Sequence, residues 1–306
     1  MPERPSAASV PPAPYPSAAE EGVQGRAVEL SGYGVPLSGL IALPGRTAPR
    51  AVVVALHGGG MRAGYFHGRA DPGASLLTLA ARHGYAALAL DRPGYGRSAE
   101  RVPHGMGLAE QAAVVRGALA GYRRSHPCGA GFFLVGHSLG GKVALTTAAG
   151  WRKGGLLGVD VSGISDRWAV SPTRLTGPGA RGTHGLHWGP LALYPPRTFE
   201  LAAPLIAPLP RREAEEAPYW PSTFAAIAPR IRVPVRFTFA EHERWWRCDA
   251  RTVREMTARL ASPLVRTERL EGAGHNISLG NAARTYHHRV LDFLAMCHRP
   301  PRAAPA

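Results

Sequence analysis

The sequence predicts an α/β fold, with a mostly parallel central sheet, helices on both faces and a cap or lid inserted into it. Strand-length apolar runs alternate with segments whose apolar residues recur at helical spacing, as in parallel strands joined by crossover helices. The alternation lapses at about residues 163–230 and then resumes, which indicates an insertion on top of one sheet. With 306 residues, of which 45% are hydrophobic, the chain can bury the core that such a sheet needs.

The first elements follow from apolar runs and from residues that start or stop helices. Residues 27–42 have the pattern of two strands around a Gly/Pro turn. Residues 51–56 form a continuous apolar run, as expected of a strand covered on both faces. Asp71 then caps a predicted helix that has Pro72 in its first position and is stopped by Gly84.

The later segments continue the same alternation of strands and helices. In chain order, the further expected elements are a strand with its exit loop at 85–98, a helix at 107–124, a strand at 131–136, a helix at 139–150, a strand at 156–163 and, after the insertion, a strand at 233–240, a helix at 249–260, a strand at 264–270 and a helix at 281–296. In the last helix Tyr286, Val290 and Leu294 share one face, which we expect to be buried against the sheet.

The two ends of the chain differ in composition from the middle. Residues 1–23 are rich in Pro, Ala and Ser and predict a disordered leader, and residues 300–306 predict a short tail. The leader lacks the basic start and apolar stretch of a secretory signal, and no window of about 18 apolar residues predicts a membrane span. Three scattered cysteines suggest free thiols. We therefore expect one domain over residues 24–299 in a cytoplasmic protein.

A formal charge of +15 is compatible with nucleic-acid binding, but its distribution argues against that function. Nearly all of the excess is arginine, spread along the chain without a long basic run. We expect neither a nucleic acid nor a membrane as partner, although a basic surface could attract an acidic carrier protein or a phosphate-bearing substrate. The sequence predicts no particular oligomeric state.

The segment Gly136-His137-Ser138-Leu139-Gly140 fits the pattern G-x-S-x-G between a predicted strand and a predicted helix. In this setting the serine occupies a strained, sharp turn, and the small residues on either side let strand and helix approach each other. The turn lifts the hydroxyl above the sheet, at the positive end of the following helix. A serine hydroxyl is a weak nucleophile that needs a base, an orienting group and oxyanion donors. Ser138 is therefore the predicted nucleophile.

With this motif and three others, residues 24–297 resemble the α/β-hydrolase fold family. The other motifs are His57-Gly58-Gly59-Gly60 after a buried strand, the loop Asp91–Ser98 after the next strand, and Gly274-His275-Asn276 after the last strand. The resemblance implies a serine hydrolase of the esterase or thioesterase type, with a catalytic triad in the chain order nucleophile, acid, histidine.

The resemblance also implies the base and the oxyanion hole. His275 is the expected base, because it lies in a Gly-rich loop after the last strand. One oxyanion amide is expected from Leu139, the residue after the nucleophile, and the other from Gly59, with Gly60 as the close alternative.

Five carboxylates compete for the role of the triad acid. The resemblance places the acid after the strand that follows the insertion, where Glu243 stands in the position of the family's aspartate. A glutamate can accept the imidazole N–H and hold its tautomer. The neighbouring Glu241 and Asp249 could take its place, and Asp160 and Asp166 lie near the end of the preceding strand, another acid location in this fold.

Other histidines have less suitable positions in the sequence. His137 abuts the serine, but in this motif its side chain points away and packs or forms hydrogen bonds. His287 and His288 lie on the final helix, where surface or packing roles are expected. His184 and His187 lie in the insertion and could line a pocket.

The predicted function is cleavage of a carboxylic ester or thioester through an acyl-enzyme on Ser138. The substrate is expected to be a medium-sized apolar or aromatic acyl compound, which could be linked to a carrier or to coenzyme A. This expectation rests on aromatic residues in or after the insertion, namely Trp168, Trp188, Tyr194, Phe199, Tyr219, Trp220, Phe224, Trp245 and Trp246.

The sequence is compatible with other functions of the same site. The same triad could serve an acyltransferase or cyclase of secondary metabolism or a C–C bond hydrolase, and a binding protein on this fold is the alternative without activity. A serine nucleophile argues against the dehalogenases and epoxide hydrolases of the family, which use aspartate. We expect neither a cofactor nor a metal, because no H-x-x-x-H, C-x-x-C or P-loop pattern occurs.

Overall fold

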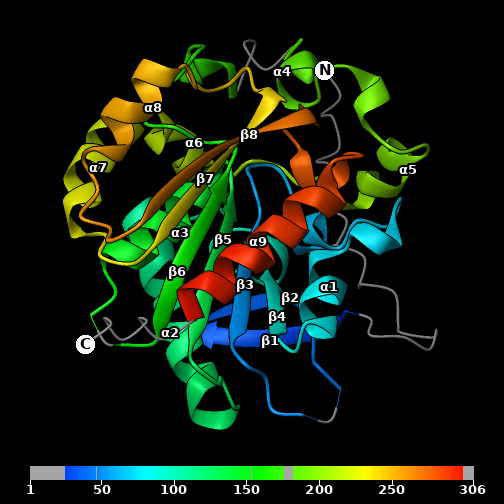
Figure 1. Cartoon of the computed structure of the whole chain (residues 1–306), viewed down its shortest axis with the longest axis vertical. Helices are drawn as coiled ribbons and strands as arrows, with labels where there is room; N and C mark the ends of the chain where they lie inside the picture. Colours follow the sequence, from blue (N-terminus) through cyan, green and yellow to red (C-terminus); the bar gives the residue numbers. More distant parts are fainter. Residues whose placement is uncertain (1–24, 46, 153, 176–181, 299–306) are drawn as a thin grey trace, which may run out of the picture.

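The computed structural model describes residues 25–45, 47–152, 154–175 and 182–298, so the predicted leader and tail lie outside the described residues. Over these ranges the centre is an eight-stranded sheet in the order β1-β2-β4-β3-β5-β6-β7-β8 (Figure 1). Its strands are β1 (Arg26–Gly32), β2 (Val35–Ala42), β3 (Val52–Leu56), β4 (Ala86–Leu90), β5 (Phe132–His137), β6 (Leu156–Ser162), β7 (Val235–His242) and β8 (Val265–Gly274).

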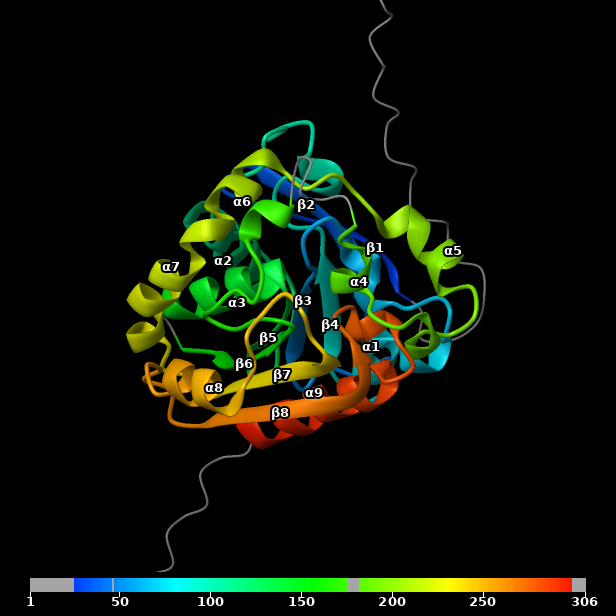
Figure 2. The ribbon, with the colours of Figure 1, turned by 90° about the horizontal axis from the view of Figure 1, so that it is seen from above.

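The sheet is mostly parallel, as the sequence predicts. Strand β2 runs antiparallel to β1 and β4, and every pair from β4 to β8 is parallel. The main covering helices are α1 (Leu76–Arg82), α2 (Leu108–Ser125), α3 (Leu139–Ala149), α8 (Ala250–Thr257) and α9 (Ala283–His298). Figure 2 shows α1 and α9 on one face of the sheet and α2 and α3 on the other. Within the described ranges, no helix is both long and apolar enough to cross a membrane.

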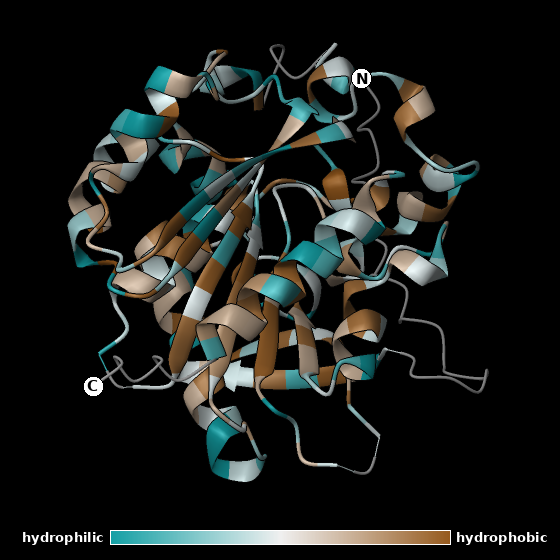
Figure 3. Ribbon diagram, viewed as in Figure 1, coloured by the Kyte–Doolittle hydropathy of each residue, from teal (hydrophilic) through white to brown (hydrophobic). Residues whose placement is uncertain are grey.

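Each face of the sheet has its own hydrophobic core. In β3, Val52, Val54 and Leu56 pack in the core beneath α2 and α3, whereas Val53 and Ala55 pack in the core beneath α1 and α9. This alternation explains the continuous apolar run, because a strand covered on both faces needs apolar side chains at every position. Figure 3 shows the central strands coloured mainly as hydrophobic.

The region before α1 differs from the single helix predicted to begin after Asp71. Asp71 accepts a hydrogen bond from the Gly73 amide at 3.0 Å and caps only a 3₁₀ turn, Pro72–Ala74. The chain then becomes extended at Ser75, whose hydroxyl caps α1 by accepting from the Thr78 amide at 3.2 Å. The prediction of one continuous helix is therefore wrong, because Ser75 offers the backbone a second N-terminal cap.

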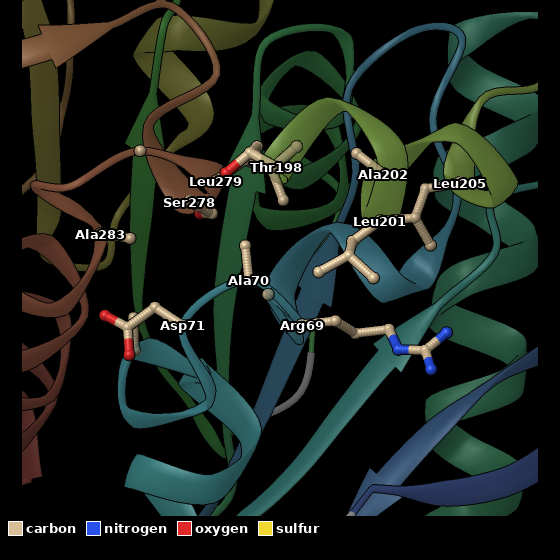
Figure 4. A pocket seen from close by; sticks show the side chains of 13 residues that line it. Arg69, Ala70, Asp71, Thr198, Leu201, Ala202, Leu205, Ser278, Leu279 and Ala283 are labelled. Carbon is tan, nitrogen blue, oxygen red and sulfur yellow. The ribbon is translucent and has the colours of Figure 1, made fainter. Parts of the chain in front are cut away.

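The segment predicted as a cap connects β6 to β7 over the carboxyl ends of the parallel strands (Figures 1 and 2). Its α-helices are α4 (His184–His187), α5 (Thr198–Ala202), α6 (Arg211–Glu216) and α7 (Trp220–Ile227). Figure 4 shows Leu201 and Leu205 beside Arg69 and Ala70, where α5 and the turn after it meet the body. The space left at this seam is about 10 Å³, roughly the room of one water, so the two surfaces are closely packed.

A buried ion pair links two neighbouring strands of the sheet. The Asp160 carboxylate on β6 accepts a hydrogen bond from Arg236 Nε on β7 at 2.5 Å and one from the Tyr286 hydroxyl of α9 at 3.0 Å. Both charged side chains are nearly inaccessible to solvent. Asp160 therefore has a structural role between sheet and helix, remote from the exposed surface.

We expect Asp160→Ala to lower the free energy of unfolding by about 3–5 kcal/mol, because it leaves the Arg236 charge buried without its main partner. Urea denaturation measures this loss. The control is Glu200→Ala, which removes an exposed ion pair with Arg197 and should cost less than about 1 kcal/mol. Equal losses in the two variants would contradict the structural role of Asp160.

Candidate active site

The predicted site residues lie at the carboxyl ends of parallel strands. His57 follows β3, Ser138 follows β5, Glu243 follows β7, and His275 follows β8. Because neighbouring parallel strands end at the same edge of a sheet, residues far apart in sequence meet there.

Ser138 occupies a strained turn between β5 and α3. Its φ of 50° and ψ of −121° lie in a region that side-chain-bearing residues rarely adopt. The flanking glycines are required sterically. A Cβ on Gly136 would lie 2.6 Å from a backbone atom of α3, and one on Gly140 would lie 2.1 Å from the Leu56 carbonyl oxygen. The packing therefore fixes the position of the serine at the start of α3.

Two hydrogen bonds connect Ser138, His275 and Glu243. His275 Nε2 lies 3.1 Å from Ser138 Oγ, and His275 Nδ1 lies 2.7 Å from Glu243 Oε2. Since a carboxylate only accepts, Nδ1 carries the proton and leaves Nε2 free to accept from the serine hydroxyl. The other carboxylate oxygen of Glu243 accepts from the Trp245 amide at 2.9 Å, which fixes the acid in turn. The arrangement can deprotonate the serine and stabilise the imidazolium that results.

The four alternative carboxylates are engaged elsewhere. Their partners are the Gly272 amide for Glu241, the Thr252 amide for Asp249, Arg236 for Asp160 and Arg259 for Asp166. The structure therefore brings Glu243 to His275 and holds the other four carboxylates at different contacts.

The amides expected to bind an oxyanion differ in their contacts. Leu139, Gly59 and Gly60 line the cavity in front of Ser138. The Gly60 amide donates to the Tyr95 hydroxyl at 3.1 Å and is therefore occupied. Among the described residues, the amides of Leu139 and Gly59 have no hydrogen-bond partner. The pair Gly59 and Leu139 is thus available to a ligand oxygen.

A buried arginine supports the glycine loop, a feature that the sequence analysis did not assign. Arg92 Nε donates to the His57 carbonyl at 2.7 Å, and Arg92 Nη1 donates to Glu213 of α6 at 2.5 Å. The Tyr95 hydroxyl donates to the second Glu213 oxygen at 2.8 Å. This network ties the cap to the loop that carries Gly59. Arg92 and Tyr95 lie in the loop Asp91–Ser98, one of the family motifs found in the sequence. Glu213 lies in no such motif, so no signal in the sequence pointed to it.

Burial favours the neutral form of two other histidines near the site, His137 and His187. His137 Nδ1 lies 3.1 Å from the Ser162 hydroxyl, and burial, with His275 as a further cause, holds the pKa of His137 well below its ordinary value. His187 of α4 lines the cavity, and the same two causes lower its pKa to about 4. Neither imidazole places a positive charge beside His275 at neutral pH.

Three further histidines that the sequence analysis weighed have contacts away from the serine. The His184 ring contacts Trp188, His287 forms hydrogen bonds with the Ala74 carbonyl and the Ser278 hydroxyl, and the His288 ring contacts His83.

The cavity in front of Ser138 has a volume of about 270 Å³ and a largely aromatic wall. Trp168, Trp188, Trp245 and Trp246 line it. Of the other aromatic residues predicted for the lid, Tyr194, Trp220 and Phe224 are buried in packing, whereas Phe199 and Tyr219 are 37% and 66% exposed. No group of three or more His, Cys, Asp or Glu side chains in the described part of the chain is arranged to hold a metal ion.

Comparison with known proteins identifies the family. The chain matches the alpha/beta hydrolase family over residues 53–287 and therefore belongs to it. This membership confirms the predicted fold and the predicted class of enzyme, an alpha/beta hydrolase.

Similar solved structures share the fold at low sequence identity. A soluble variant of monoglyceride lipase from Saccharomyces cerevisiae is 17% identical, with 94% of this chain and 100% of that chain covered and a TM-score of 0.63. A thermostable carboxyl esterase from Bacillus coagulans is 15% identical, with 92% and 100% covered and a TM-score of 0.65. No curated protein sequence matches this chain.

Gly163, the residue after β6, lies so close to His275 that a side chain at this position would contact the imidazole. A Cβ there would lie 2.9 Å from His275 Cε1, and the φ of Gly163 is +60°. We expect Gly163→Ala to displace the imidazole and to slow labelling of Ser138 by a fluorophosphonate about 100-fold.

Gly272→Ala is the matched control for the backbone strain. Its φ is +63°, and no described atom lies within 4 Å of an added Cβ. The Gly272→Ala variant should lose about 1–2 kcal/mol in its free energy of unfolding, and the fluorophosphonate should label its Ser138 at the original rate. Equal labelling rates in the two variants would show that Gly163 does not position His275.

Proposed function

We propose that this protein is a serine hydrolase that cleaves a carboxylic ester or thioester of a medium-sized apolar or aromatic acyl group. The observation that carries the proposal is the relay of two hydrogen bonds from Glu243 through His275 to Ser138. Membership of the alpha/beta hydrolase family supports ester hydrolysis in general. The names of the similar solved structures, a monoglyceride lipase and a carboxyl esterase, agree with an ester substrate.

In the first step Ser138 Oγ attacks the substrate carbonyl carbon while His275 Nε2 takes the hydroxyl proton. Glu243 holds the imidazole in the tautomer that can accept at Nε2, and its charge stabilises the imidazolium. The strained turn presents the hydroxyl at the N-terminus of α3, where the helix dipole favours negative charge.

The carbonyl oxygen becomes an oxyanion as the new bond forms. The amides of Gly59 and Leu139, which no described residue occupies, would donate to it. One such donor contributes about 3–4 kcal/mol to transition-state stabilisation in serine hydrolases. The buried Arg92 network would keep the Gly59 loop in place during this change of charge.

Collapse of the tetrahedral intermediate breaks the bond to the alcohol or thiol, which leaves with the proton held by His275. A water molecule then attacks the acyl-enzyme and gives one proton to His275 Nε2. When the second intermediate collapses, this proton returns to Ser138 Oγ and the carboxylic acid is released. Protons and bonds balance over the cycle, which consumes one water.

The proposed acyl preference follows from the lining of the cavity. Among its described lining residues, no Asp, Glu, Lys or Arg occurs, and four indole rings form much of the wall. Burial of each methylene stabilises a bound acyl chain by about 0.8 kcal/mol. An uncharged acyl group that fills about 270 Å³ therefore suits the site best.

Hydrolysis of p-nitrophenyl esters tests this function. We expect kcat/KM to rise up to about fourfold for each added methylene from acetate to hexanoate, because each methylene is buried against the indoles. Mass spectrometry should find the free acid as product. Ser138→Ala should lose more than about 10³-fold in kcat/KM and all labelling by a fluorophosphonate.

Two outcomes would contradict the proposal. Labelling that persists in Ser138→Ala would remove the serine from the mechanism. A transferred or cyclised acyl product in place of the free acid would favour the acyltransferase or cyclase alternative.

A second prediction concerns the acid. Glu243→Gln keeps the size of the side chain but removes the charge that stabilises the imidazolium, so kcat should fall by about 10²–10⁴-fold. Asp249→Asn should leave kcat unchanged, because Asp249 caps α8 and asparagine is an equally good cap. Full activity of the Glu243→Gln variant would overturn the assignment of the acid.

A further inference from the structure

Lys142 lies one helical turn after Ser138 in α3, and its side chain is only 5% exposed. Its ammonium group lies over the faces of three indole rings, at 4.6 Å from the Trp168 centroid, 5.3 Å from Trp246 and 5.4 Å from Trp220. These rings hold the ammonium in one place by cation–π attraction.

Within the part of the chain that the structure describes, the ammonium of Lys142 has no hydrogen-bond or ion-pair partner. No described protein group therefore accepts from its three N–H donors. Burial lowers the pKa of Lys142 to about 7, because the charged form is poorly solvated there. A buried cation of this kind gains stability from an anion that reaches it.

A second cavity, of about 280 Å³, gives access to Lys142. It lies beneath α6 and α7 and beside the start of α2, with Leu139, Trp220 and Tyr219 among its apolar and aromatic walls. This volume is close to the lower end of the range for small-molecule sites.

The other long polar side chains of the second cavity already have partners. Gln111 contacts Arg92 and the Met106 carbonyl, Glu213 contacts Arg92 and Tyr95, and Glu216 accepts from the Leu108 amide at the N-terminus of α2. Lys142 differs from them because no described residue accepts a hydrogen bond from its ammonium group.

We infer that the second cavity binds the carboxylate of a small organic acid, with Lys142 Nζ as the recognising group. An ammonium fixed by three indoles can donate to both carboxylate oxygens without losing side-chain freedom on binding. Leu139 and Trp220 would contact the hydrocarbon part of the acid.

The charged groups around Lys142 are compatible with an anion in this place. Glu213 and Glu216 face it from α6, and Arg92 faces it from the loop after β4. The charge of Glu213 is balanced by Arg92, and the charge of Glu216 is stabilised by the N-terminus of α2. Lys142 therefore supplies a positive charge that no neighbouring carboxylate has neutralised by direct contact.

The second cavity is distinct from the one in front of Ser138. The two share Leu139 as a lining residue, and Trp168 and Trp246 line the first cavity while they contact Lys142. Binding at Lys142 requires no reaction at Ser138, so the inference does not rest on the proposed function.

The test uses the indole N–H signals of the six tryptophans in a two-dimensional ¹H–¹⁵N NMR spectrum, with benzoate as probe. Trp220 lines the second cavity alone, whereas Trp188 and Trp245 line the first cavity alone. We expect benzoate to shift the Trp220 signal in a saturable way, and benzamide, which has the same shape without charge, to leave it unchanged. Assignment comes from single Trp→Phe variants.

Lys142→Met keeps an unbranched side chain of nearly the same length and removes its charge, so benzoate should bind about 10- to 100-fold more weakly. Arg152→Met is the matched control, since it removes one cation near the end of α3 and should leave affinity unchanged. In the original protein, affinity should be nearly constant from about pH 5 to about pH 6, where benzoate is ionised and the lysine is protonated. Above about pH 7 it should fall up to tenfold per pH unit, because the carboxylate binds the protonated lysine.

Three results would overturn the inference. The first is the absence of a saturable shift at Trp220, and the second is a shift confined to Trp188 and Trp245, which would place benzoate in front of Ser138. The third is unchanged affinity in Lys142→Met. If that variant does not fold, an affinity that stays flat from pH 6 to about pH 9 would overturn it equally.

Discussion

The strained backbone of Ser138 is the constraint on which the rest of the site depends. A positive φ at a serine persists only where the surrounding packing fixes it. Here α3 approaches β5 at Gly136 and the end of β3 at Gly140 so closely that neither glycine has room for a side chain. The same turn determines where the first amide of α3 points and which side chains follow one turn later. The positions of the Ser138 hydroxyl, of the Leu139 amide and of Lys142 are thus consequences of one local geometry.

A buried hydrogen-bond network holds the glycine loop after β3 in place beside this turn. Arg92 reaches the backbone of the glycine loop and the carboxylate of Glu213 in the cap, so loop, body and cap share one set of hydrogen bonds. A buried arginine is expensive to leave without a counter-charge. The loop that carries Gly59 is therefore held by a hydrogen bond from Arg92, which an ion pair with Glu213 fixes in turn.

Local sequence features predicted the fold and pointed to much of the candidate site. Buried strands such as β3 are continuous apolar runs, and Ser138 and His275 lie in short motifs directly after strands, so both were visible without the structure. For the triad acid, the family resemblance favoured Glu243, but four other carboxylates stayed open, because the contact between Glu243 and His275 joins the ends of two separate strands.

Features that join distant segments could not be predicted. Arg92 and Glu213 are 121 residues apart, and the three indoles around Lys142 come from three separate segments. The error before α1 has a different origin, because Asp71 and Ser75 are both good caps and the sequence does not rank them.

Leu139 contributes a backbone amide to one cavity and a side chain that can be changed without altering that amide. Any residue other than proline can present the backbone amide at this position, whereas the side chain belongs to the one described residue that lines both cavities. The side chain also restricts its surroundings, since a Cβ on Gly59 would lie 2.5 Å from Leu139 Cδ1. A substitution at position 139 can therefore change the shape of both cavities at once while the backbone amide stays in place.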